Sequence, residues 1–283
     1  MKYLFVTTIL WAFSFSLIGE FLAGSINSYT AAFIRSLLAL LTFTLLLRKP
    51  IAANLLSLKL TAIGAIQLGL MYICYFHAFT LLTVPLVLLF TILTPIYITL
   101  LDDALTKRFR PSVLLVAVIA VLGALVIRQQ SLGDNYWLGF LVLQGANLCF
   151  AFGQVAFKRL ARKEPSCLLP EQQRYFFFGA SIVTLIAMLL YGEWPSGITI
   201  SQIGILIWLG VVASGLGYFW WNRGAATTDT GTLAIMNNAV IPLGLVVNLI
   251  FWGQDVDYIK LVVGGGIILL AMALHRRLTA NLD

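Results

Sequence analysis

The sequence is poor in charged residues. Only 10% of its 283 residues are charged, whereas about a quarter are charged in ordinary soluble domains. Eleven acidic and eighteen basic residues are too few to cover the surface of a water-soluble protein of this size, so a soluble globular domain is excluded. With 60% hydrophobic residues and a mean hydropathy of +0.96, the composition is that of a membrane protein.

Cysteine, histidine and catalytic motifs are equally scarce. Three cysteines cannot all pair, and Cys74 and Cys149 lie within apolar runs, where we expect them to be small packing residues. The two histidines are far apart, which makes a metal site a poor prediction. No Ser-His-Asp, HExxH or CxxC arrangement and no GxxxxGK[ST] loop occurs. We therefore expect no enzymatic activity, no ATP hydrolysis by that route and no cofactor.

Ten apolar runs are long enough to cross a bilayer, which takes about 20 residues in a helix. Proline and charged residues separate several of these runs, as at Arg48-Lys49-Pro50, Phe109-Arg110-Pro111 and Glu193-Trp194-Pro195. The sequence thus predicts an all-α integral membrane protein with ten transmembrane helices. The predicted spans are 3–21, 29–47, 60–82, 84–101, 112–128, 136–157, 172–191, 203–223, 231–252 and 259–275.

The basic residues indicate how these spans are oriented. If ten spans alternate from a cytoplasmic N-terminus, all eighteen basic residues except Arg35, Arg128 and Lys260 fall on the cytoplasmic side. Cytoplasmic loops of membrane proteins are enriched in Lys and Arg. The pattern predicts that both termini are cytoplasmic. It also argues against nucleic acid as a partner, because the positive charge lies in short loops between apolar runs.

The two halves of the chain repeat one another. A shift of 147 residues aligns Tyr75–Leu100 with Asn222–Val247, and each segment carries a proline at the equivalent position. The repeats, 1–130 and 131–283, hold five spans each, and since five is odd the second copy must enter the membrane upside down. Inverted repeats are typical of secondary transporters, in which a ligand binds between the halves near the membrane midplane.

Arg35, early in the second span, is the costliest polar residue within the predicted membrane region. An arginine left bare there costs about 2.5–3.5 kcal/mol on insertion scales. One interpretation is that its planar guanidinium binds a substrate carboxylate through two parallel hydrogen bonds. The other is a structural pair with Glu20 or with helix-end carbonyl groups. The two are compatible if substrate replaces part of the internal pairing.

Amide side chains are the second group of candidates. In the sixth span, Gln144 and Asn147 are three residues apart and share a helical face, which predicts either the lining of a hydrated path or amide hydrogen bonds between helices. In the ninth span, Asn237 and Asn238 are adjacent and offer donors and acceptors together. We expect these amides to take part in substrate binding.

Aromatic side chains in the spans are the third group. Trp11 lies beside Ser14 in the first span, Tyr72 and Tyr75 share a face of the third, and Trp221 lies in the eighth. Most membrane aromatics pack or sit at the interface. Trp11 and Tyr72 lie too deep for an interfacial belt, so we expect them to line a binding site.

Ten spans, two five-helix copies, an early arginine in the second span and the paired positions Pro95 and Pro242 resemble the EamA-type branch of the drug/metabolite transporter superfamily. This resemblance covers essentially the whole chain. More specific strings are similar to the bacterial biotin transporters of that superfamily. They are TTILWAFSFS (7–16), QLGLMY (67–72), LLFTILTPIYIT (88–99), GVVASG (210–215) and GTLAIMNN (231–238).

The resemblance implies a transporter of the bacterial inner membrane that imports biotin, a ligand with a carboxylate tail, an apolar chain and ring, and a ureido group. Arg35 would bind the carboxylate, and Trp11, Tyr72 and Trp221 would cover the apolar part. The ureido group would pair with amides, with Ser14 and Tyr75 in reserve. The alternative is export of amino acids or related metabolites. The amides concerned are Gln144, Asn147, Asn237 and Asn238.

The sequence offers no residue that is well placed to carry a proton and so couple transport to an energy source. Import of an anion against an inside-negative potential costs about 2.3 kcal/mol per charge per 100 mV. Cotransport of protons, or trapping of the substrate by use inside the cell, would offset this cost. Glu20 is the acidic residue nearest to a suitable depth, and its position at the rim makes it a poor proton carrier.

Overall fold

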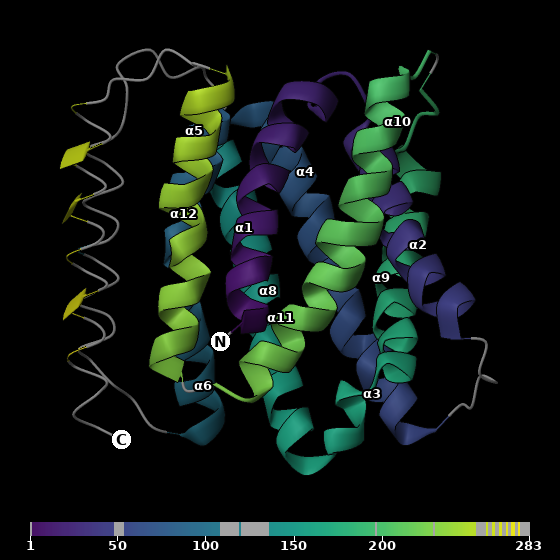
Figure 1. Cartoon of the computed structure of the whole chain (residues 1–283), viewed down its shortest axis with the longest axis vertical. Coiled ribbons are helices and arrows are strands. Elements are labelled where there is room, and N and C mark those ends of the chain that lie inside the picture. Colours follow the sequence, from purple (N-terminus) through teal and green to yellow (C-terminus); the bar gives the residue numbers. More distant parts are fainter. Residues whose placement is uncertain are drawn as a thin grey trace.

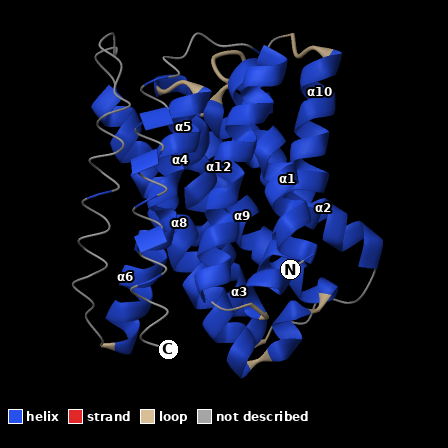
Figure 2. Cartoon of the chain, turned by 60° about the vertical axis from the view of Figure 1, so that its left-hand side comes forward, coloured by secondary structure: helices blue, strands red, loops and turns tan. Residues whose placement is uncertain are grey.

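The computed structural model describes residues 2–47, 54–107, 136–195, 197–228 and 230–252, with Ile119 and scattered positions between 259 and 277. Within this part of the chain every regular element is helical, and the helices stand side by side in one bundle (Figures 1 and 2). Seven helical segments of this part are long and apolar enough to span a membrane, and α12 adds the shorter apolar stretch Met236–Trp252.

The helices are α1 (Lys2–Leu17), α2 (Ser28–Leu47), α3 (Leu55–Gly64), α4 (Met71–Leu81), α5 (Val84–Phe90), α6 (Thr94–Thr106), α8 (Tyr136–Lys163), α9 (Pro170–Tyr191), α10 (Ile200–Ile207), α11 (Gly217–Ala226) and α12 (Thr230–Trp252). Three π-helical segments continue or join them: η1 (Ile18–Leu22), η2 (Ala65–Leu70) and η5 (Trp208–Leu216). Two 3-10 segments are η3 (Thr91–Leu93) and η4 (Pro165–Leu168).

Eight predicted spans fall on described helices, and the spans 112–128 and 259–275 lie outside the described residues apart from scattered positions. The third and eighth spans are each built as α-helix, π-helix and α-helix: α3–η2–α4 and α10–η5–α11. The fourth span is α5–η3–α6, and its 3-10 turn precedes Pro95, whose missing N–H interrupts the helical hydrogen-bond ladder.

The third and eighth spans begin in the same way. Asn54 and Ser57 form a capping box at the start of α3, and Thr199 and Gln202 form one at the start of α10. Each box satisfies backbone N–H groups that a helix start leaves unpaired. The two spans therefore share a cap, a π-helical middle and an α-helical end.

Ion pairs define one end of the bundle. Lys59 Nζ lies 2.7 Å from Glu164 Oε1, and Arg159 Nη2 lies 2.9 Å from Asp102 Oδ1. We call this the basic end, because the basic residues near the ends of the described helices all lie here. No basic residue of the described helices lies at the opposite end, which we call the far end. The basic residues concerned are Lys2, Lys59, Lys107, Lys158, Arg159, Arg162, Lys163, Arg174 and Arg223.

Hydrogen bonds at the far end join segments that are distant in the sequence. Asn27 Nδ2 donates to Tyr191 O at 3.2 Å, and Gln202 Nε2 donates to Phe21 O at 3.0 Å. With both ends identified, α1, α9 and α12 run away from the basic end, and α2, α8 and α6 run toward it (Figure 1). The segment α3–η2–α4 runs away from the basic end and α10–η5–α11 runs toward it.

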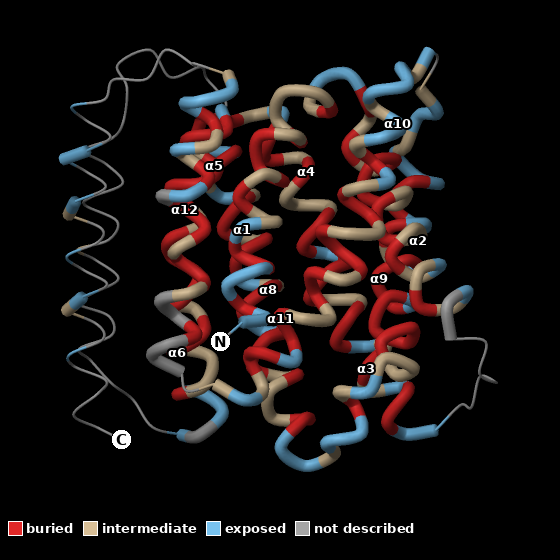
Figure 3. Tube along the Cα trace, viewed as in Figure 1, coloured by how far each residue is buried: buried red, intermediate tan, exposed pale blue. Residues whose placement is uncertain are grey.

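Helix contacts between the halves occur in matching sets. α1 packs on α11 and α12, and α8 packs on α4 and α6. α2 packs on η5, α9 packs on α3, and α2 and α9 pack on each other. Buried positions face the middle of the bundle and exposed apolar ones face outward (Figure 3). An apolar outer surface suits a lipid environment, where no polar skin is needed.

Candidate functional site

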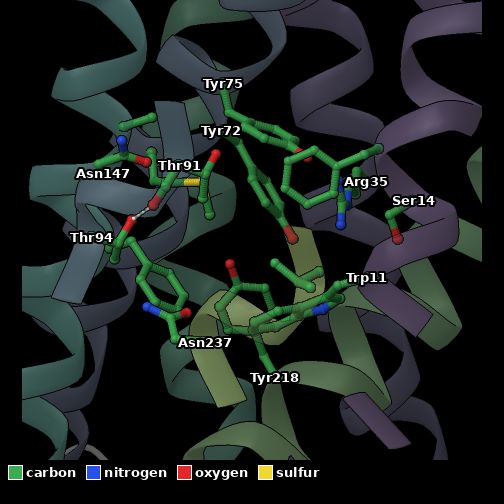
Figure 4. A pocket seen from close by; sticks show the side chains of 15 residues that line it. Trp11, Ser14, Arg35, Tyr72, Tyr75, Thr91, Thr94, Asn147, Tyr218 and Asn237 are labelled. Carbon is green, nitrogen blue, oxygen red and sulfur yellow. Dashed lines mark hydrogen bonds between the residues drawn. The ribbon is translucent and has the colours of Figure 1, made fainter. Parts of the chain in front are cut away.

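A cavity lies inside the bundle. Helices from both halves of the chain contribute side chains to it (Figure 4). Seven of the ten predicted site residues line this cavity: Trp11, Ser14, Arg35, Tyr72, Tyr75, Asn147 and Asn237. The tertiary structure therefore brings together residues that the sequence placed in spans one, two, three, six and nine.

Three predicted site residues do not line the cavity. Trp221 is fully buried and packs behind Trp11, with ring centroids 4.8 Å apart. Gln144 lies behind Asn147 and hydrogen-bonds to it, and Asn238 is buried beside Asn237. These three are placed to support lining residues and do not face the cavity themselves.

The structure adds lining residues that the sequence did not predict. Tyr218 had a signal, because it lies three residues before Trp221 and so shares its helical face. The others, apolar side chains and threonines, resemble ordinary span residues in the sequence. The added residues are Phe15, Met71, Thr91, Thr94, Ala146, Phe150, Tyr218 and Val240.

Arg35 is 3% exposed and is held by η5. Its Nε donates to Ser214 Oγ at 2.5 Å, and Ser214 Oγ is 2.6 Å from the Tyr72 hydroxyl. The guanidinium carbon lies 4.4 Å from the centroid of the Tyr72 ring, a cation–π contact. Glu20 is not among its partners, so the alternative of an Arg35–Glu20 pair is wrong in this structure.

The Nη1 atom of Arg35 remains without a hydrogen-bond partner in the described residues. Asp and Glu are also missing from the described residues that line the cavity. A buried cation without a carboxylate is costly, and an anionic ligand that brings its own carboxylate would remove much of that cost. The site is therefore suited to a carboxylate-bearing molecule.

An aromatic wall lies next to this cation. The Trp11 ring is 4.9 Å from that of Tyr218 and 6.0 Å from that of Phe150, and Trp11 Nε1 donates to Ala213 O at 3.0 Å. Because Ala213 and Ser214 both belong to η5, one π-helical segment anchors both Trp11 and Arg35. π-Helical turns are frequent at functional sites. The wall offers flat apolar surface to the uncharged part of a ligand.

Amides lie on the other side of the cavity from Arg35 (Figure 4). Asn147 Nδ2 donates to Phe90 O and to Gln144 Oε1, each at 3.0 Å. Asn237 is 7% exposed, and its Nδ2 has no partner in the described residues. The cavity thus combines a cation, an aromatic wall and hydrogen-bonding amides. In the part of the chain that the structure describes, no group of His, Cys, Asp and Glu could hold a metal ion.

Membrane-capable helices around a cavity lined from both halves of the chain are typical of a multi-pass membrane transporter. The EamA-like transporter family matches residues 1–129. A solved crystal structure that is 19% identical superposes with a TM-score of 0.68, over 96% of this chain and 95% of that chain, so the two share a fold.

Similarity to bacterial relatives extends over the whole chain. A protein of Pseudomonas aeruginosa named probable biotin transporter is 47% identical over 280 residues, which cover 98% of this chain and 97% of the relative. Proteins named biotin transporter from Salmonella typhimurium and Escherichia coli K12 are each 45% identical, covering 99% of this chain and 94% of each relative. The chain belongs to the EamA-like transporter family of the drug/metabolite transporter superfamily, which confirms the resemblance seen in the sequence.

Proposed function

We propose that this protein imports biotin across the bacterial inner membrane, as a secondary transporter that works by alternating access. The observation that carries the proposal is the buried, incompletely paired guanidinium of Arg35 beside an aromatic wall. Full-length relatives with 45–47% identity are named biotin transporters, which supports the same substrate.

Biotin matches the three chemical features of the cavity. Its carboxylate would accept hydrogen bonds from Arg35, a charge-assisted contact. Its apolar chain and ring would lie against Trp11, Tyr72 and Tyr218. Its ureido group would reach the amides of Asn147 and Asn237.

A competition experiment tests this assignment. A biotin auxotroph that lacks its own biotin transporter and expresses this protein should take up radiolabelled biotin, and unlabelled biotin should compete. Biotinamide, whose carboxylate is blocked, should compete about 100-fold less well, because the contact with a buried cation is lost. Absence of biotin uptake together with raised tolerance to an added amino acid would instead favour the alternative function, metabolite export.

The proposed architecture is two inverted five-helix repeats, 1–130 and 131–283, with the basic end and both termini in the cytoplasm. Opposite helix directions, the capped α–π–α spans in each half and the matching helix contacts support the inversion. The concentration of Lys and Arg at one end supports the orientation. Such repeats would allow the two halves to rock about the central cavity.

Thiol labelling tests the orientation. Ser201→Cys at the far end should react with a membrane-impermeant maleimide on intact spheroplasts, whereas Ser166→Cys at the basic end should react only after permeabilisation. The parent protein should give little background at Cys167, because burial and the nearby Glu164 raise the pKa of its thiol to about 11. Labelling of position 166 on intact spheroplasts would contradict the proposed orientation.

A further inference from the structure

The amide of Asn147 is held in one orientation by two acceptors. Its Nδ2 donates to the backbone carbonyl of Phe90 and to Gln144 Oε1, each at 3.0 Å. An amide nitrogen has two N–H donors, so both are used. The oxygen Oδ1 is then left to face the cavity that Asn147 lines (Figure 4).

The Phe90 carbonyl lies at the start of the 3-10 turn that precedes Pro95. In a continuous α-helix it would accept from Thr94 N–H, four residues later. In η3 that N–H bonds to Thr91 O instead. A carbonyl oxygen can accept two hydrogen bonds, and Asn147 of α8 donates one to Phe90 O from another helix.

This contact fixes which end of the amide points inward. A backbone carbonyl only accepts hydrogen bonds, so the side-chain atom that faces Phe90 O must be the nitrogen. In a flipped amide the Asn147 oxygen would face the two acceptors Phe90 O and Gln144 Oε1, and neither hydrogen bond could form. Asn147 therefore presents a hydrogen-bond acceptor, its Oδ1 atom, to the cavity.

Gln144 completes this arrangement from behind. Its Oε1 accepts from Asn147 Nδ2 at 3.0 Å and from the Tyr97 hydroxyl at 3.1 Å. Its own Nε2 has no partner in the described residues, and the side chain does not line the cavity. The prediction that Gln144 contacts the substrate is thus replaced by a role one layer further out.

We propose that Gln144 is a positioning residue that, together with the Phe90 carbonyl, holds Asn147 as a hydrogen-bond acceptor. The site then selects ligands that present an N–H donor at Asn147 while their carboxylate lies at Arg35. This inference rests on the proposed function, and for biotin the donor is a ureido N–H. A ligand that carries only acceptors at that position cannot form a hydrogen bond with the Asn147 oxygen.

Substrate discrimination tests this role. In the wild-type protein, biotin methylated at the ureido nitrogens should compete with radiolabelled biotin at least about tenfold less well than biotin, the size of one lost hydrogen bond. Gln144→Met removes the acceptor behind Asn147 at similar length. It should raise the KM for biotin about tenfold, leave the maximal rate unchanged, and reduce the discrimination against the methylated analogue to about threefold or less.

Two further variants separate positioning from folding. Gln144→Glu, in its neutral form, keeps an oxygen acceptor and loses only the unpartnered Nε2, so it should restore discrimination. Gln154→Met is the matched control: Gln154 lies on the same helix, is 2% exposed, and hydrogen-bonds to nothing in the described residues through Oε1 or Nε2. It does not line the central cavity and should leave both KM and discrimination unchanged.

The outcomes distinguish this inference from the function on which it rests. If the wild-type protein takes up no biotin, the proposed function fails, and this inference fails with it. If the wild-type protein takes up biotin but accepts the methylated analogue equally well, only the Asn147 acceptor role is overturned. Full discrimination in Gln144→Met overturns the positioning role.

Discussion

Replacing Arg35 by alanine should lower the ratio of maximal rate to KM for biotin uptake about 100-fold or more. The variant removes the one cation among the described residues that line the cavity, and loss of one partner of a buried charge pair costs about 2–5 kcal/mol. Uptake of radiolabelled biotin into proteoliposomes at several concentrations measures the loss directly.

The Arg35→Ala protein should still fold. Within the described part of the chain the Arg35 side chain makes one hydrogen bond, to Ser214, and its buried charge is itself costly in a membrane, so the melting temperature in detergent should not fall. This separates lost binding from lost folding.

Arg35→Lys should also transport poorly. Arg35 Nε bonds to Ser214 while Nη1 has no partner in the described residues, and a single ammonium group cannot replace both atoms of this fork. Ser214→Ala keeps the guanidinium but releases it from η5, and should give a smaller loss of about tenfold.

Arg223→Lys is the control for arginine substitution as such. Arg223 lies on α11 at the basic end, is exposed, and does not line the cavity, so uptake should be unchanged. A well-folded Arg35→Ala protein with normal biotin uptake would contradict the carboxylate role.

Substituting Gly179 should have the largest effect on stability. A Cβ at Gly179 would lie 1.9 Å from the backbone oxygen of Thr61, and a Cβ at Gly64 would lie 1.8 Å from that of Phe176. α3 and α9 thus approach through glycine on both sides, as small residues allow in membranes. Because the obstacles are backbone atoms, the helices must move apart to admit a side chain.

Gly179→Ala should lower the melting temperature in detergent by roughly 5–10 °C, the consequence of overpacking by a few kcal/mol. Gly179→Leu should yield little folded protein. The measurement is the thermal loss of the monodisperse peak in size-exclusion chromatography. Gly204→Ala on α10 is the matched control, since a Cβ there meets nothing within 4 Å and should be neutral. An unchanged melting temperature in Gly179→Ala would show that the α3–α9 approach is looser than described.

The sequence alone was sufficient to predict the helices and to predict which polar residues lie within them. Apolar runs, prolines and charges predicted the eight described spans with ends within six residues of those in the structure, and they placed Arg35, Asn147 and Asn237 inside spans. These properties follow from the transfer free energy of short segments into lipid, to which each residue contributes almost independently of the fold. The family resemblance rests on the same local strings.

Only the tertiary structure decided which polar groups face the cavity and what orients them. Ser214 gave no signal in the sequence as the partner of Arg35, 179 positions away, and the sequence could not rank Asn147 above Gln144. The direction of the Asn147 amide depends on a carbonyl 57 positions away, at the start of a proline-associated turn. Hydrogen-bond direction is set by contacts between distant helices, whereas hydropathy is set within each one, so the first needed the packed bundle and the second did not.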